Sequence, residues 1–200
     1  MTDFDPKVPY NELPELPPPL ELVETTEILK ACIQSRVALA ELKQAAELIP
    51  NAAVLVNALP LLEARASSEI ENIVTTTDKL FEFADIAEDK ADAATKEALR
   101  YRTALYEGSK MVRRGMLSTD MAIHICSTIK GMELDIRAES GTTLKSRMTG
   151  EVIYTPPEGQ QLLQQKLDNW ADFMQNDVEI DPLVRMAVQH YQFEAIHPFS

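Results

Sequence analysis

Near its end the chain reads His190-Tyr191-Gln192-Phe193-Glu194-Ala195-Ile196-His197-Pro198-Phe199, followed by Ser200. Proline disfavours helical geometry at the residue before it, so a helix running through this stretch should give way to a loop at His197. At such a helix end an imidazole can face a cleft instead of a neighbouring turn. His197 is therefore the first candidate for chemistry, and we expect most of its partners to lie beyond Ser200.

His190, Glu194 and His197 are spaced i, i+4 and i+7, which places them on one face of a helix. Imidazole and carboxylate groups both ligate zinc or iron, so a metal-dependent hydrolase is one interpretation of this face. The spacing differs from the His-Glu-x-x-His signature of metalloproteases, and structural packing of His190 and Glu194 is a second interpretation. A catalytic role for His197 without a metal is the third, and these residues alone leave all three open.

The composition is that of a globular protein with an acidic surface, since 45% of the residues are hydrophobic and the net charge is −13. Such a surface repels phosphate backbones and argues against nucleic acid as a partner, although a local pocket could still hold a nucleotide. No stretch is long and apolar enough to span a bilayer, and the N-terminus lacks a signal-peptide pattern. Cys32 and Cys126 are predicted to be buried free thiols, so we expect a cytoplasmic protein without membrane contact.

Hydrophobic periodicity predicts an all-α body with one β-hairpin. The predicted helices cover residues 21–49, 57–73, 80–86, 93–113 and 118–131, a Gln- and Leu-rich stretch that ends near residue 173, and a last helix that starts at Asp181-Pro182. A proline-rich arm, Leu13–Pro19, precedes them and should lie across the surface of the domain. The hairpin is expected over Gly141–Thr155, where glycines and threonines flank a β-branched and aromatic run.

The stretch Ser67-Ser68-Glu69-Ile70-Glu71-Asn72 lies in the second predicted helix. Ser67 and Glu71 are an i, i+4 pair, so they share a face beside the apolar stripe. In an acidic protein such a face is usually solvated. Alternatively, the Glu71 carboxylate faces into a domain and pairs with an arginine.

The second strand of the hairpin contains Val152, Ile153, Tyr154 and Thr155. An exposed strand offers backbone amides and carbonyls with which another extended chain can pair. This strand is therefore either an ordinary edge strand or a docking site for a peptide segment.

Together these motifs resemble the Fic family. The family's active-site motif begins histidine-proline-phenylalanine, and His190–Phe199 is similar to the helix and the opening of that motif. Val152–Pro157 looks like the family's flap hairpin. Ser67, Glu71 and Asn72 stand at the fixed positions of its inhibitory pattern, Ser/Thr-x-x-x-Glu-Gly/Asn. The resemblance spans nearly the whole chain.

This resemblance implies a Fic-like helical bundle with one flap hairpin, preceded by an N-terminal helical segment. It implies a Fic-associated domain over residues 1–92, with the inhibitory helix near 60–73, and the N-terminal part of the catalytic core over residues 93–200. The phosphate-cradling run, its arginines and a metal-binding acidic residue are expected after Ser200, so no metal ligand is assigned within this chain. A homodimer is also compatible with the family analogy.

The resemblance further implies a protein adenylyltransferase, provided that the motif is completed beyond Ser200. AMP would pass from ATP, with Mg²⁺, to a Ser, Thr or Tyr hydroxyl of a target protein, which could be the protein itself. His197 would be the general base, and Pro198 and Phe199 would shape its loop. Val152–Thr155 would hold the target, and Glu71 would inhibit by pairing with a motif arginine where the ATP γ-phosphate binds.

Three alternatives stand beside this function. On the same fold the protein could remove AMP, with Glu71 positioning the attacking water, or it could transfer another phosphate-containing group. His190, Glu194 and His197 could serve a metal-dependent hydrolase. Residues 1–200 could also form a non-catalytic regulatory fragment.

Overall fold

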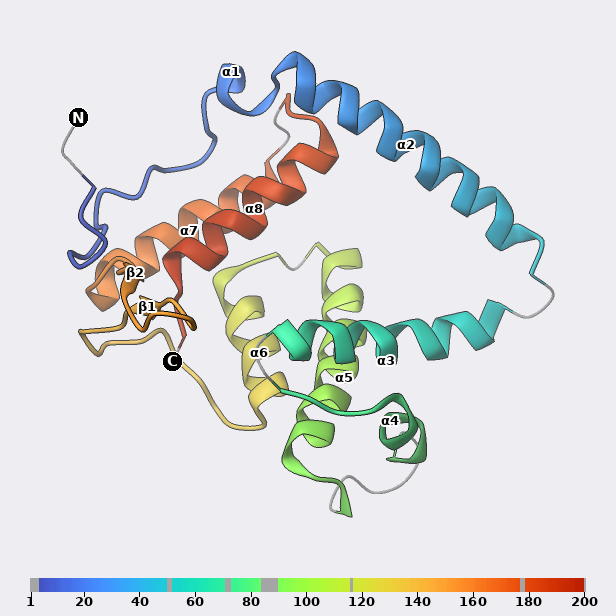
Figure 1. Cartoon of the computed structure of the whole chain (residues 1–200). Helices are drawn as coiled ribbons and strands as arrows, with labels where there is room; N and C mark the ends of the chain where they lie inside the picture. Colours follow the sequence, from blue (N-terminus) through green and yellow to red (C-terminus); the bar gives the residue numbers. More distant parts are fainter. Residues whose placement is uncertain are drawn as a thin grey trace. The chain divides into compact units, whose positions relative to one another are not determined.

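The computed structural model describes residues 4–49, 52–70, 73–83, 90–115, 117–176 and 179–199. Within these residues the chain is mostly helical, with one small antiparallel hairpin, which confirms the predicted fold class (Figure 1). The helices are α1 (Leu20–Val23), α2 (Thr26–Glu47), α3 (Ala52–Ile70), α4 (Thr77–Phe83), α5 (Ala93–Arg113), α6 (Thr119–Lys130), α7 (Gln160–Gln175) and α8 (Pro182–Ile196). The strands are β1 (Leu144–Lys145) and β2 (Val152–Tyr154), with Leu144 opposite Tyr154.

Local signals in the sequence account for several helix ends. The carboxylate of Asp181 accepts a hydrogen bond from the amide of Leu183 at 2.9 Å, and Pro182 occupies the first turn of α8, where its missing N–H is not needed. α5 ends before Gly115, whose φ of 74° is readily adopted only by glycine. The helix predicted over residues 21–49 is divided, because α1 ends at Val23 and α2 begins at Thr26.

The chain divides into two compact units. The first comprises residues 1–36, 117–119 and 135–200, and the second comprises residues 37–116 and 120–134. His197 and the hairpin thus belong to the first unit, whereas Ser67 belongs to the second.

In the first unit the antiparallel helices α7 and α8 lie side by side (Figure 1). The indole N–H of Trp170 donates to the carbonyl of Gln189 at 3.0 Å, which joins the two helices. Arg185 Nη2 donates to the carbonyls of Met174 and Asn176 at 2.7 Å each, which satisfies acceptors at the end of α7. The buried hydrophobic core of this part of the unit consists of Cys32, Phe173, Ile180 and Val184.

The proline-rich arm docks onto the first unit through its backbone. Lys166 Nζ donates to the carbonyl of the buried Leu13 at 2.6 Å. The side chain of Asn169 makes two bonds to the backbone of Leu16, accepting from its amide at 2.8 Å and donating to its carbonyl at 2.9 Å. Prolines cannot form a ladder with their own amides, so side chains of α7 supply the partners of this segment.

In the second unit α3 packs across α5 (Figure 1). Thr75 and Thr95 share a buried hydrogen bond of 2.7 Å between their hydroxyl oxygens, which ties the segment after α3 to the first turn of α5. The hydrophobic core of this unit consists of Leu61, Ala64, Leu80, Ala98 and Leu99.

The burial of side chains differs from the expectations in two helices, α2 and α6. Only Cys32 of α2 is buried, and apolar side chains that share its helical periodicity, such as Ile33 and Leu42, are exposed. Cys32 is buried as predicted, but Cys126 is half-buried, not buried. Periodicity identified the helices, because helical geometry is local, but not all of their ends, since α3 begins at Ala52 and α4 at Thr77. It also did not determine how much of each helix is covered.

Asp92 should make the second unit sensitive to acid. Its carboxylate caps α5 by accepting from the amide of Thr95 at 2.9 Å, and it pairs with Lys79 Nζ at 2.6 Å. The bond from Lys79, followed by the bonds from Thr95, lowers the pKa of Asp92 from 3.8 to about 2. A lowered pKa means that the ionised form stabilises the fold above about pH 4, and that this contribution is lost as the pH falls from about 4 to about 2.

We therefore expect Asp92→Ala to lower the free energy of unfolding by about 1 kcal/mol at neutral pH, because a helix cap is lost. Asp92→Asn keeps a capping oxygen and should lose less, since the ion pair is half-exposed and contributes little. Urea unfolding followed by circular dichroism at neutral pH and near pH 2 measures both effects. Equal losses for the two variants, or losses independent of pH, would contradict this assignment.

Candidate active site

His197 caps the C-terminus of α8 in a left-handed backbone conformation, with φ 47° and ψ 62°. Its amide donates to the carbonyl of Phe193 at 3.0 Å, so the helix ends at the residue before Pro198, as the sequence predicted. The left-handed region costs a residue with a Cβ about 1–2 kcal/mol, so surrounding contacts must hold His197 in place.

Two side chains from distant segments bind the last carbonyls of α8. The phenol of Tyr154 in β2 donates to the carbonyl of Ala195 at 2.8 Å. Arg137 donates through Nε to the carbonyl of His197 at 2.7 Å and through Nη2 to that of Ile196 at 3.4 Å. Carbonyls at a helix C-terminus have no partner within the helix, and a cation there also interacts favourably with the helix dipole.

Arg137 lies at the centre of this arrangement and is only 4% exposed. Its Nη2 also donates to the carbonyl of Pro157 at 2.5 Å, and its backbone amide donates to the carbonyl of Pro198 at 2.9 Å. Burial lowers the pKa of Arg137, which nearby Glu158 and Tyr154 partly oppose. No sequence pattern identifies Arg137, because it lies in a segment between α6 and β1 whose composition is not typical of a functional site.

Tyr154 is held from its other side by the segment Phe4–Tyr10, which we call the N-terminal arm. Its ring lies 6.4 Å from that of Phe4, nearly parallel, and 6.5 Å from that of Tyr10. Burial first, and then the proximity of Tyr191 and Tyr10, raises the pKa of Tyr154 to about 12. The phenol therefore stays protonated at neutral pH and remains a donor to α8.

The four residues proposed to hold a target occupy different environments. Val152, Ile153 and Tyr154 form β2, and the side chain of Ile153 is 55% exposed. Thr155 lies after the strand and is buried, and its hydroxyl donates to the carbonyl of Pro6 at 2.7 Å. Its own carbonyl accepts from the amide of Tyr10 at 3.0 Å, so both groups are engaged by the arm.

Pro198 and Phe199 are anchored in the same unit as His197. Pro198 is buried. The ring of Phe199 lies 6.1 Å from that of Phe193, which in turn lies 5.1 Å from that of Trp170. This aromatic row connects the loop after α8 to α7.

His190 and Glu194 are exposed on α8. Among the residues that the structure describes, no three His, Cys, Asp or Glu side chains are grouped so that they could hold a metal ion. The arrangement of His190, Glu194 and His197 thus gives no support to the metal-dependent hydrolase.

The described part of the predicted inhibitory motif, from Ser67 to Ile70, lies at the end of α3 in the second unit. The hydroxyl of Ser67 donates to the carboxylate of Glu63 at 3.1 Å, one turn earlier. The carbonyl of the buried Ser68 accepts from the amide of Ile73 at 2.9 Å. Glu71 and Asn72 lie outside the described residues, so their proposed role stays a prediction.

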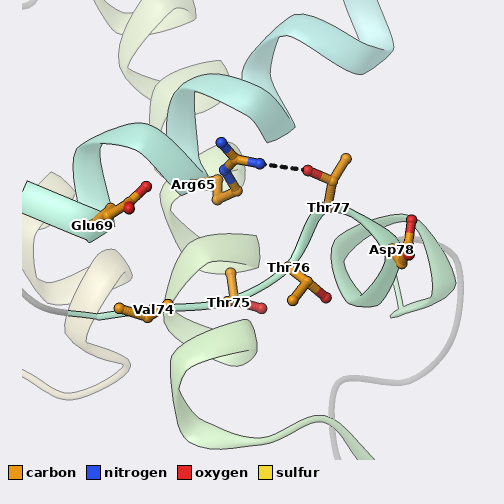
Figure 2. A pocket seen from close by; sticks show the side chains of 7 residues that line it. All are labelled: Arg65, Glu69, Val74, Thr75, Thr76, Thr77 and Asp78. Carbon is orange, nitrogen blue, oxygen red and sulfur yellow. Dashed lines mark hydrogen bonds between the residues drawn. The ribbon is translucent and has the colours of Figure 1, made fainter.

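A cavity of about 480 Å³ opens beside this end of α3 (Figure 2). Figure 2 shows the guanidinium of Arg65 directed toward Thr77, to whose hydroxyl its Nη1 donates at 2.7 Å. The remaining lining residues are Glu69, Val74, Thr75, Thr76 and Asp78. With two carboxylates and one guanidinium this cavity is a poor site for phosphate.

Two family models match the chain. The model described as Fic/DOC family N-terminal matches residues 29–110, and the model described as Fic/DOC family matches residues 117–200. No helix in the described part of the chain has both the length and the apolar character needed to cross a membrane.

Proposed function

Because the chain belongs to the Fic/DOC family, whose members generally transfer nucleotidyl groups to proteins, we propose that it is a protein adenylyltransferase. In this proposal AMP passes from ATP to a Ser, Thr or Tyr hydroxyl of a target protein or of the protein itself. We also propose that residues 1–92 form an N-terminal domain and that residues 93–200 form the N-terminal part of the catalytic core.

The observation that carries this proposal is the placement of His197 next to the flap. Tyr154 in β2 is bonded to Ala195, two residues before His197, so the proposed target strand and the proposed base are joined through one hydrogen bond. A peptide paired with the exposed part of β2 would present its side chains near the end of α8. Strand pairing uses backbone groups, so a target bound in this way would need a hydroxyl but no other particular side chain.

In the proposed reaction His197 acts as general base. A serine, threonine or tyrosine hydroxyl is a poor nucleophile, and an imidazole can take its proton as the oxygen attacks the α-phosphorus and pyrophosphate leaves. Such a base contributes ~10²–10⁴-fold to the rate. The rest must come from positioning and from charge neutralisation on the phosphates.

Family members generally use Mg²⁺ together with ATP. The described residues include no acidic cluster suited to hold this ion, so none of these residues is assigned to it and no step is derived through it. We propose that the phosphate and metal contacts are made by the part of the motif that follows the histidine, proline and phenylalanine.

The test is a transfer assay on the full natural protein with ATP labelled in either the α- or the γ-phosphate. We expect the α-label to become covalently attached to protein and the γ-label to be released. Incorporation of the γ-label would identify transfer of another group. Loss of AMP from a modified target, without incorporation, would show that the protein works in the opposite direction.

Binding of ATP to residues 1–200 alone, measured by calorimetry beside the full protein, addresses the regulatory alternative. We expect weaker binding to residues 1–200, since the proposed phosphate contacts follow them. Transfer activity absent from the full protein as well would overturn the proposed function.

A further inference from the structure

We propose that Arg137 is the positioning residue of the active-site histidine, because its guanidinium holds the backbone turn from which the imidazole of His197 projects. The catalytic part of this inference rests on the proposed function. The positional part does not, because it concerns only the conformation of the turn at the end of α8.

The contacts of Arg137 join three separate segments of the first unit. Its guanidinium binds the carbonyls of Ile196 and His197 on one side and that of Pro157, just after the flap, on the other. Its backbone amide closes the arrangement by binding the carbonyl of Pro198. Arg137 therefore binds three consecutive carbonyls, those of Ile196, His197 and Pro198.

The turn needs such a support because His197 is strained and has other conformations available. Pro198 excludes a continued helix at His197, but an extended backbone is compatible with a residue before proline and relieves the left-handed strain. A change from the left-handed to the extended region would rotate the Cα–Cβ bond and aim the imidazole elsewhere. The bond from Arg137 Nε to the His197 carbonyl is lost in that rotation, so Arg137 selects the left-handed form.

The environment of Arg137 is costly for a residue that serves stability alone. Among the described residues it forms no ion pair with a carboxylate, and its buried Nη1 has no hydrogen-bond partner. Burying a cation without a direct carboxylate partner, together with an unsatisfied donor, is unfavourable, and apolar side chains often replace buried charges without loss of stability. Such an arrangement is expected where a conformation must be held for function.

Arg185 offers a matched control in the same unit. It too donates only to backbone carbonyls, those of Phe173, Met174 and Asn176, and its buried Nε also has no partner in the described structure. These bonds satisfy carbonyls at the end of α7, and none of them reaches the turn at His197. Arg185→Gln thus removes a similar set of bonds without touching the proposed support.

Residues 1–200 contain three histidines, His124, His190 and His197, so ¹³C labelling at the imidazole Cε1 gives three signals from this part of the chain. The signal that His197→Ala removes is that of His197. We expect Arg137→Gln to shift or broaden this signal while the other two stay unchanged. Arg185→Gln should leave all three signals unchanged, and circular dichroism and thermal unfolding confirm that both variants are folded.

Arg137→Lys keeps the positive charge but replaces the planar guanidinium by one compact ammonium group, which can reach only part of the same carbonyls. Its effect on the His197 signal should therefore be smaller than that of Arg137→Gln. It also serves as the test variant if Arg137→Gln does not fold. An unchanged His197 signal in a folded Arg137 variant, or an equal change in Arg185→Gln, would overturn the inference.

Kinetics on the full protein test the consequence for catalysis. A misaligned base lowers the rate of the chemical step, so Arg137→Gln should lower kcat by up to ~10²-fold and leave KM for ATP nearly unchanged. Arg185→Gln should change neither. A shifted His197 signal with an unchanged kcat would overturn the catalytic part, whereas a wild-type protein without transfer activity would overturn the proposed function and leave the positional test valid.

Discussion

His197→Ala is expected to lower AMP transfer by ~10²–10⁴-fold while leaving ATP binding unchanged. The imidazole is proposed to take the proton of the attacking hydroxyl, and alanine offers no group for this task. ATP binding should persist, because a general base contributes to the transition state and not to the nucleotide contacts. Covalent incorporation of α-labelled AMP measures the first effect, and calorimetry with ATP measures the second.

The matched control is His190→Ala. His190 lies on the exposed face of α8, two turns before His197, so its loss changes the histidine content without removing the proposed base. We expect transfer by this variant to equal that of the wild type. If His197→Ala retained activity close to the wild type, His197 would not be the base. If His190→Ala were equally inactive, the whole face of α8 would be required, as in the metal-site interpretation.

Glu71→Gly is expected to increase self-modification by about tenfold to a hundredfold. The proposed inhibition depends on one carboxylate that pairs with an arginine of the motif, and a charge-assisted hydrogen bond is worth about 1.5–3 kcal/mol. Removal of the carboxylate frees both the arginine and the space for the γ-phosphate, so that ATP binds in a productive pose. Time courses of AMP incorporation from labelled ATP measure the change.

Glu69→Gly is the control for this prediction. Glu69 is an exposed carboxylate in the last turn of α3, two residues before Glu71 in the sequence, and it lines the cavity beside Arg65. Glu69→Gly places glycine in the last turn of α3 at a helix penalty of up to about 1 kcal/mol, so it reports the effect of loosening this end of the helix. Activation by both variants would point to loosening of α3 and not to Glu71, and unchanged or lower incorporation by Glu71→Gly would remove the inhibitory role.

The sequence predicted several helix ends well, because these ends are encoded by neighbouring residues. Asp181 and Pro182 mark the start of α8, and Gly115 follows α5, where the chain needs a positive φ. The same local rule located the end of α8 at His197, since a proline follows it. The hairpin was also predicted correctly, because glycines and threonines flank a β-branched run.

What the sequence could not predict was the set of contacts between distant segments. Arg137 binds carbonyls near residues 157 and 197, and every residue has a carbonyl, so no side-chain pattern records such a partnership. For the same reason the sequence predicted strand β2 but not the hydrogen bonds between Thr155 and the N-terminal arm.

By itself, then, the sequence determined the identity and order of the helices, the hairpin and the position of His197 at a helix end, since these follow from local backbone preferences. Only the tertiary structure decided how that histidine is held. Its left-handed turn is unfavourable in isolation and persists because Arg137 and Tyr154, brought from other parts of the chain, satisfy the last carbonyls of α8.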